Sequence, residues 1–305
     1  MGTTWTVKLV APAPQLAPIR SSIDSELASL VAQMSTWEPD SNLSRFNRAD
    51  ADTWHALPDD LFTVLAFALE LTRDTDGAYD PTVGPLVNLW GFGPDGAPRT
   101  QPPTPAQIAQ ASAHVGWRRI ELDAAAHRAR QPGGVFVDVS SLGPGYAVDR
   151  IAARLHEHGV ENFLVELGGE MRAAGAKPDG SAWRVAVERP DGADAGAFEL
   201  VVALDDLAAG SSGDYRVGFE HDGIRYSHTL DPRTGAPVTH GLAAVTVLAP
   251  TAMQADALAA ALMVLGPERG WSFARERDIA AAFTQRTADG YERRLTPALE
   301  ARRVP

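Results

Sequence analysis

The sequence of 305 residues contains no cysteine, which excludes disulfides, thiolate metal sites and a thiol nucleophile. It has no run of 18 apolar residues, so no transmembrane segment is expected. Positive charge is scarce, because 27 Lys and Arg stand against 39 Asp and Glu and the net charge is −12. Nucleic acids and anionic membranes bind to basic surfaces, so neither is an expected partner. A local site for a small anionic ligand is still possible.

The remaining composition is that of an ordinary globular protein, with 45% apolar and 22% charged residues. A chain of this length can form one large domain or two fused halves. The first residues, MGTTWTVKLV, read as a strand and lack the pattern of a signal peptide. The protein is therefore cytoplasmic as given, or an export segment has been removed.

Hydrophobic periodicity predicts helices over residues 19–34 and 59–73, and a short helix ending near residue 114 after a proline-rich linker at 97–105. A last helix is expected from Thr251 to about Leu265, stopped by Gly266-Pro267. Besides residues 3–10, strands are expected at residues 183–188, 198–204, 216–220, 224–230 and 242–248. The Asp222-Gly223 pair is a hairpin signal between two of them. This order predicts an α+β fold with mainly antiparallel sheet and flanking helices.

The most informative segment is VDVSSLGPGYAVDRIAARLHEHG, residues 137–159. An apolar strand carries Asp138 into a loop of small residues at 140–145, and the loop opens into a helix. A helix start favours anions, whereas the Asp138 carboxylate would repel a bare phosphate, so the pair makes most sense with a metal ion between them. Glycine-rich loops of this kind are also common as plain structure.

Two further residues are candidates for chemistry. Asp256 lies on an alanine-rich helix, where an acid is either part of the solvated face or a metal ligand; Ala260, one turn on, shares its face and can ligate nothing. His228 follows Tyr226 on a strand, with Leu230 on the same face, and is either a half-buried histidine bonded to backbone or a general base or phosphate contact.

Several small-residue and aromatic segments are less specific. Residues 34–41 and the long loop 77–90 carry aromatic side chains, which suit either irregular core packing or stacking on a planar ring such as flavin. The glycine pair in residues 166–170 implies a close backbone approach, and residues 210–213 read as a small-residue turn.

Taken together and in this order, these segments resemble the sequence motifs of the ApbE family, whose members are FAD:protein FMN transferases. The matching blocks cover nearly all of residues 1–267 and read MGTTW, MSTWEPDSNLSRFN, GAYDPTVGPLVNLWGFGP, VDVSSLGPGYAVDR, VELGGEMRAAG, SSGDYR, HTLDPRTGAPV and ADALAAALMVLGP. The resemblance implies one T-fold-like α+β domain over residues 1–305. It also implies Mg²⁺-dependent transfer of FMN from FAD to a Thr or Ser hydroxyl of an acceptor flavoprotein, with release of AMP. Many members are periplasmic and membrane-anchored.

The resemblance also assigns roles to individual positions. The residues implied to contact FAD are Met1, Trp37, Ala78, Tyr79, Asp80, Asp138, Pro144 and Leu230. The magnesium ligands implied are the backbone carbonyl of Ser141, the carboxylate of Asp256 and the side chain at position 260. His228 matches the family histidine that assists deprotonation of the incoming hydroxyl.

The sequence departs from the family pattern at two of these positions. Pro144 stands where lysine is frequent and removes a cationic contact to FAD, and Ala260 stands where a threonine hydroxyl usually binds magnesium. Water can replace that ligand, since Mg²⁺ tolerates water readily, so weaker metal affinity is expected. Two alternatives remain open: a flavin carrier or store without transfer activity, and an FAD pyrophosphatase that gives FMN and AMP.

Overall fold

The computed structural model describes residues 2–187, 190, 200–215 and 217–303. They form two compact units, each assembled from segments that lie apart in the sequence. Unit 1 comprises Met1–Ala28, Leu142–Tyr215 and His240–Pro305, and unit 2 comprises Ser29–Ser141 and Arg216–Thr239. The single domain expected over residues 1–305 stays a prediction.

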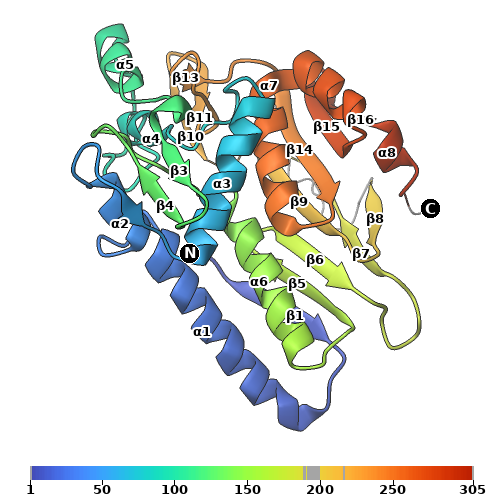
Figure 1. The fold of residues 1–305 in the computed structure, drawn as a ribbon. Helices are drawn as coiled ribbons and strands as arrows, with labels where there is room; N and C mark the ends of the chain where they lie inside the picture. Colours follow the sequence, from blue (N-terminus) through green and yellow to red (C-terminus); the bar gives the residue numbers. More distant parts are fainter. Residues whose placement is uncertain (1, 188–189, 191–199, 216, 304–305) are drawn as a thin grey trace. The chain divides into compact units, whose positions relative to one another are not determined.

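Unit 1 is built on a seven-stranded sheet in which every neighbouring pair is antiparallel (Figure 1). In spatial order its strands are β1 (Trp5–Leu9), β5 (Phe163–Leu167), β6 (Glu170–Ala174), β9 (Ala208–Gly213), β14 (Leu242–Ala249), β15 (Ala280–Thr287) and β16 (Gly290–Leu295). Strand β14 is buried along its whole length, on both faces. The sheet is therefore covered from both sides, which requires apolar residues at consecutive positions of its central strand.

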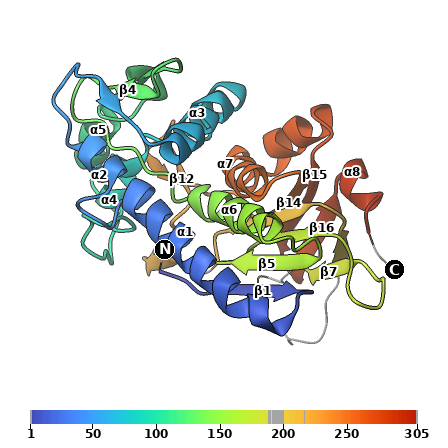
Figure 2. The ribbon, with the colours of Figure 1, turned by 60° about the horizontal axis from the view of Figure 1, so that its bottom comes forward.

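Two helices cover one face of this sheet, α6 (Gly143–Glu157) and α7 (Ala252–Glu276) (Figures 1 and 2). The buried residues of α6 recur at helical spacing and form one apolar stripe, which includes Ala147, Val148, Ile151 and Leu155. Helix α7 begins at an N-cap, Thr251, whose side chain accepts a hydrogen bond from the Gln254 N–H.

The expected stop of this last helix at Gly266-Pro267 is only partly right. Gly266 has φ 80° and ψ −178°, which interrupts the helix, but the helical chain resumes and continues to Glu276. Glycine adopts that positive φ without steric penalty, and proline suits the first turn of a new helix because its missing N–H has no partner there. The pair therefore makes a sharp break between two helical segments.

The opposite face of the sheet packs against the hairpin β7 (Trp183–Ala186) and β8 (Val201–Leu204) and against the short helix α8 (Pro297–Glu300). Trp183, Val202 and Leu204 are buried there together with Leu248 of β14. The strands expected at 183–188 and 198–204 are thus confirmed in part, and residues 188 and 198–199 lie outside the described residues.

Unit 2 contains short helices and small sheets. Helix α1 (Leu16–Met34) runs across the division between the units, and η1 (Ala13–Gln15) precedes it. The helices that follow are α2 (Asn42–Asn47), α3 (Asp59–Asp74), α4 (Gly84–Leu89), α5 (Pro105–Ser112) and η2 (Trp117–Arg119). The strands are β2 (His55–Ala56), β4 (Arg128–Arg130) and β3 (Glu121–Asp123) in one sheet, β10 (Gly218–His221) with β11 (Ile224–Ser227), and β12 (Leu230–Asp231) with β13 (Ala236–Pro237).

The core of unit 2 around α4 is aromatic. Trp90 is buried, and its Nε1–H donates to the Gly235 carbonyl at 2.9 Å. The Tyr226 ring stacks on Trp90 at 5.6 Å and on Phe219 at 5.2 Å between ring centroids. The hairpin that carries Phe219 and Tyr226 turns at Asp222-Gly223, both with positive φ, as the sequence predicts.

Three local expectations are wrong. Residues 210–213 form strand β9 and no turn, because they pair with β14 along its length. Residues 135–139 form no assigned strand, since the backbone of Val137 bonds to the Asn47 side chain and the Asp138 N–H bonds to the Pro81 carbonyl. The expected loop at 77–90 includes helix α4. In residues 166–170 the glycine pair is the two-residue turn of the β5–β6 hairpin, with both glycines at positive φ.

The principal expectations for the fold are confirmed. The chain is α+β with mainly antiparallel sheet, and the helices over 19–34 and 59–73 are present as α1 and α3. Among the described residues, no helix combines the length and apolar character needed to cross a membrane.

Candidate functional site

In unit 2 the structure brings several of the predicted site residues together. The turn after α3 holds Ala78 and Tyr79 in buried positions, and the Tyr79 N–H donates to Thr75 Oγ1 at 3.2 Å. The Ser141 hydroxyl donates to the Tyr79 phenolic oxygen at 3.1 Å. Residues 62 positions apart in sequence, predicted separately as an FAD contact and a metal-ligand position, are therefore neighbours.

Asp80, next in this turn, is buried and accepts several hydrogen bonds. Its Oδ1 accepts from the Thr82 N–H at 2.8 Å and the Thr82 hydroxyl at 2.6 Å, and its Oδ2 accepts from the Trp117 N–H at 3.1 Å. Burial raises the pKa of Asp80 above its usual range, and the bonds from Thr82 and Trp117 offset part of that rise. The carboxylate is thus fixed in position before any ligand arrives.

Asp138 is likewise buried and locally bonded. Its Oδ1 accepts from the Ser140 N–H at 2.8 Å and from the Ser140 hydroxyl. Its backbone N–H donates to the Pro81 carbonyl at 2.7 Å, which ties the segment before the small-residue loop to the turn that carries Tyr79 and Asp80. These contacts make one continuous polar cluster from two distant motifs.

His228 is exposed, and it lies between β11 and β12 at a break in the expected strand. The prediction that it shares a strand face with Tyr226 and Leu230 is therefore wrong, as is the half-buried environment. Its Nδ1 lies 3.3 Å from the Val217 carbonyl oxygen. A carbonyl oxygen only accepts, so Nδ1 is the donor in this contact, and in the neutral imidazole that tautomer has its lone pair on Nε2.

The other four positions predicted to contact FAD differ in their surroundings, and one of them, Pro144, lies in the first turn of α6. Trp37 is 65% exposed and available for stacking. The Leu230 side chain is buried against Leu86 and Trp90 as part of the core of unit 2. Met1 lies outside the described residues.

In unit 1, Asp256 of α7 faces the first turn of α6. Its Oδ2 accepts a hydrogen bond from the Gly145 N–H at 3.0 Å, and the residue is only 8% exposed. Asp256 is therefore not part of a solvated helix face. The N-terminus of α6, expected to offer its amides to a phosphate, holds this carboxylate instead.

Burial raises the pKa of Asp256 well above its usual range, and the nearby negative charge of Glu170 raises it further. The hydrogen bond from Gly145 acts in the opposite direction. A buried carboxylate beside a second acid is an environment that a bound cation would relieve.

Two glycines permit this close packing. A Cβ on Gly145 would lie 2.3 Å from the Ala252 carbonyl oxygen, and a Cβ on Gly210 would lie 2.5 Å from the Asp256 backbone nitrogen. Any side chain at either position would push α7 away from α6 or from β9. The glycines therefore set the position of the turn that carries Asp256.

The start of α7 is also anchored by charge. Asp149 of α6 accepts hydrogen bonds from the Ala252 and Met253 N–H groups, each at 2.9 Å, and from Arg172 of β6 at 2.6 Å. A carboxylate on free N–H groups at a helix start is a favourable arrangement. It fixes α7 to α6 one turn before Asp256.

The two positions that depart from the family pattern add no polar side chain. Pro144 lies in the first turn of α6, and Ala260 lies one turn beyond Asp256 on α7. Among the described residues there is no group of three or more His, Cys, Asp or Glu side chains that could hold a metal. One or two carboxylates with backbone oxygen and water are sufficient for Mg²⁺, so the donors present fit that ion.

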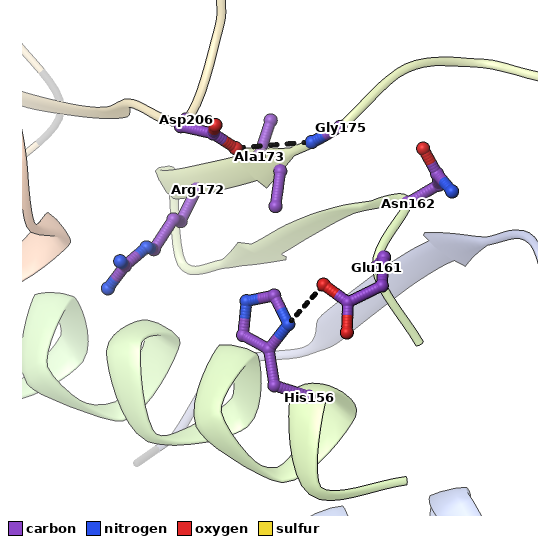
Figure 3. Close-up of a pocket in the computed structure, with 8 residues that line it drawn as sticks. His156, Glu161, Asn162, Arg172, Ala173, Gly175 and Asp206 are labelled. Carbon is purple, nitrogen blue, oxygen red and sulfur yellow. Dashed lines mark hydrogen bonds and ion pairs between the residues drawn. The ribbon is translucent and has the colours of Figure 1, made fainter. Parts of the chain in front are cut away.

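A separate polar depression of about 420 Å³ lies on unit 1 (Figure 3). It is lined by His156, whose Nδ1 is 3.3 Å from Glu161, and by Asp206, which accepts from the Gly175 N–H at 3.2 Å. Arg172 also lines it. None of the predicted site residues borders this depression.

Sequence reasoning missed three contributors to the region of Asp256. Glu170 and Asp149 gave no signal beyond their charge, and Gly210 was assigned to a turn. Strands β6 and β9 pair at Met171 with Ala209, residues 38 positions apart, which places Glu170 near Gly210. Local sequence patterns do not reveal a pairing between segments so far apart.

The whole chain, including these residues, is similar in sequence to known proteins. The ApbE family model matches residues 1–283. The FAD:protein FMN transferase of Haemophilus influenzae is 40% identical over 98% of this chain and 88% of its own length. That of Vibrio cholerae is 39% identical over 96% of this chain and 87% of its own length.

Solved structures are similar over the same extent. The apo flavinyl transferase ApbE of Pseudomonas stutzeri has a TM-score of 0.91 and 41% identity, and the match covers 99% of this chain and 94% of that one. The flavin transferase ApbE of Vibrio cholerae has a TM-score of 0.91 and 37% identity, with 99% and 96% covered.

Proposed function

The chain belongs to the ApbE family, and we propose on this premise that it is an FAD:protein FMN transferase. It takes FAD as substrate, transfers FMN to a Thr or Ser hydroxyl of an acceptor flavoprotein, and releases AMP. Among the observations on the structure, the buried Asp256 carboxylate, held by the first turn of α6 and raised in pKa, carries the proposal furthest. A buried carboxyl group whose pKa is shifted by burial and by a neighbouring charge is typical of a functional site.

Magnesium fits the donors of this region. Asp256 would hold the ion, with the Ser141 carbonyl as the further ligand that the family pattern implies, and water would take the place that Ala260 leaves without an oxygen. When bound, the ion neutralises negative charge on the pyrophosphate of FAD.

The start of α6 supports the need for a cation. Pro144 has no N–H, the Gly145 N–H donates to Asp256, and the Tyr146 N–H donates to the Leu142 carbonyl at 2.9 Å. These three positions leave no amide for a phosphate group. The helix start therefore offers a phosphate group fewer amides than the sequence suggested.

His228 acts as the base in this proposal. Its Nε2 takes the proton of the acceptor hydroxyl, while the Val217 carbonyl holds the Nδ1–H. Because His228 is exposed, a hydroxyl on another protein can reach it. The fixed carboxylates of Asp80 and Asp138 and the ring of Tyr79 would orient the flavin nucleotide.

The experiment incubates the full chain with FAD, Mg²⁺ and a flavoprotein that offers an exposed acceptor threonine. The acceptor should gain the mass of FMN, and AMP should appear in equal amount. His228→Ala should lower the rate about 10²- to 10⁴-fold while FAD still binds. Absence of any mass gain at millimolar Mg²⁺ would refute the proposal.

Ala260 favours one alternative, a carrier that binds FAD without cleaving it, because the residue removes a metal ligand from the family pattern. Chromatography of the nucleotides separates the possibilities. A carrier leaves FAD intact, a pyrophosphatase gives FMN and AMP without an acceptor, and the transferase gives AMP only together with labelled acceptor.

A further inference from the structure

We propose that Glu170 is the second carboxylate of the cation site at Asp256. This inference rests on the proposed function, which places Mg²⁺ at Asp256. It adds a side chain that the family pattern does not assign, from the sheet that underlies the two helices. Three observations on unit 1 carry it.

The first is the register of strands β6 and β9. Met171 pairs with Ala209, so Glu170, one residue earlier, falls opposite Gly210, one residue later. Directly opposed residues of an antiparallel pair project from the same face of the sheet. A Cβ on Gly210 would lie 2.5 Å from the Asp256 backbone nitrogen. Glu170 therefore lies on the same face of the sheet as Gly210, the face that the α7 turn with Asp256 covers, and its Oε2 is 3.4 Å from where a Cβ on Gly168 would lie.

The second observation is the direction of the neighbouring side chains on β6. Arg172, two residues on and thus on the same face, reaches Asp149 of α6 at 2.6 Å. Met171, on the other face, packs in the core formed with the β7–β8 hairpin. The alternation independently assigns Glu170 to the face covered by α6 and α7.

The third observation is burial. Glu170 and Asp256 are each 8% exposed, so both acids are buried on the side of the sheet that α6 and α7 cover. Two buried carboxylates at close range repel, and a dication with oxygen ligands removes the repulsion. Glu170 thus supplies from the sheet the oxygen ligands that Ala260 cannot supply from the helix.

The experiment measures cation binding by the full chain without flavin. Mn²⁺, a paramagnetic probe with similar ligand preferences, is titrated and free ion is measured by electron paramagnetic resonance. Glu170→Gln should weaken Mn²⁺ binding about 10- to 100-fold. The same variant should raise the unfolding temperature of the metal-free protein, because one of two like charges is removed, and should lose most of the increase that Mg²⁺ produces.

Glu166→Gln is the matched control. Glu166 pairs with Met171 and therefore lies on the opposite face, and a glutamine oxygen can still accept from the Gly169 N–H as Glu166 does at 3.0 Å. This variant should bind Mn²⁺ as the wild type does. Glu170→Asp, which keeps the charge on a shorter side chain, should retain more affinity than Glu170→Gln.

The outcomes separate the inference from the proposed function. A Glu170→Gln protein with wild-type Mn²⁺ affinity, or one that is merely destabilised without metal, overturns the inference and leaves FMN transfer intact. A wild type that transfers FMN but binds no Mn²⁺ without flavin also overturns it, since two buried carboxylates must hold the ion unaided. A wild type that neither binds Mn²⁺ nor transfers FMN defeats the proposed function as well.

Discussion

Replacement of Gly210 by alanine is a direct test of how the position of Asp256 is set. The added Cβ would lie 2.5 Å from the Asp256 nitrogen, 2.7 Å from the Ala255 carbonyl carbon and 2.9 Å from the Asp256 Cα, whereas ordinary contact begins at 3.4 Å. All three atoms belong to the α7 backbone, so no side chain can rotate away. Helix α7 must move by roughly 1 Å, a displacement that can lower a catalysed rate about 10²-fold.

The expected loss of stability follows from the same geometry. Overpacking of a tight core costs about 1–3 kcal/mol, and the backbone clash at Gly210 belongs at the upper end. Alanine regains about 0.5–1 kcal/mol in a strand because it restricts the unfolded chain more than glycine does. The net loss is about 2 kcal/mol, which corresponds to a decrease of about 4–8 °C in unfolding temperature at about 2–4 °C per kcal/mol.

Scanning calorimetry and Mn²⁺ titration of the same preparation measure both effects. Gly241→Ala is the control, because a Cβ there meets nothing closer than 3.7 Å and the backbone φ is ordinary. The control should unfold at or slightly above the wild-type temperature and bind Mn²⁺ normally. A Gly210→Ala protein that unfolds within 1 °C of the wild type, with unchanged Mn²⁺ affinity, would refute the close packing of β9 against α7.

Three further changes test other parts of the site. Ala260→Thr should tighten Mg²⁺ binding, measured as the Mg²⁺ concentration for half-maximal FMN transfer, because a hydroxyl replaces water one turn beyond Asp256; unchanged Mg²⁺ dependence would place the ion elsewhere. Asp149→Ala should lower the free energy of unfolding by about 2–3 kcal/mol, because it removes charged hydrogen bonds at the start of α7. As a control, removal of the exposed Asp24 carboxylate, which pairs with Arg20, should change the free energy of unfolding by less than about 1 kcal/mol. Equal losses for the two variants in urea unfolding would contradict the anchoring role of Asp149. The raised pKa of Asp80 means that the folded protein binds a proton more readily than the unfolded chain, so the contribution of Asp80 to stability is present below its unfolded pKa and lost as pH rises through the folded one. The unfolding free energy of Asp80→Asn relative to wild type should therefore fall as pH is lowered from 7 to 4, and a pH-independent difference would show that burial does not shift the pKa of this group.

Local patterns were sufficient for much of the fold. The apolar spacing of α3 and the stripe of α6 are helical in the sequence and helical in the structure, because burial of one face is what stabilises such helices. The Asp222-Gly223 hairpin was equally predictable, since few other residues accept two successive positive φ values. The order of motifs was sufficient to indicate the family.

The failures share a cause. Residues 210–213 have the composition of a turn, and they form a strand because β14 offers them backbone partners, while β6 pairs with the preceding residues 208 and 209. The helix at 252–276 was expected to stop at Gly266, yet the chain resumes as a helix whose Gly270 and Ala274 are buried. In each case tertiary packing overrides a local preference that amounts to about 1 kcal/mol per residue.

The sequence by itself determined the residue types of the site and their order: a carboxylate before a small-residue loop, an acid on an alanine-rich helix, and a histidine before a turn. Only the tertiary structure decided what each one contacts. It gave the Gly145 amide to Asp256, left His228 exposed, and paired β6 with β9 so that Glu170 lies near Gly210 on one face of the sheet. The reason is physical: hydrogen bonds, burial and charge repulsion act over a few ångströms in space, between residues that lie as far apart in the chain as the 111 positions from Gly145 to Asp256 and the 145 positions from Trp90 to Gly235.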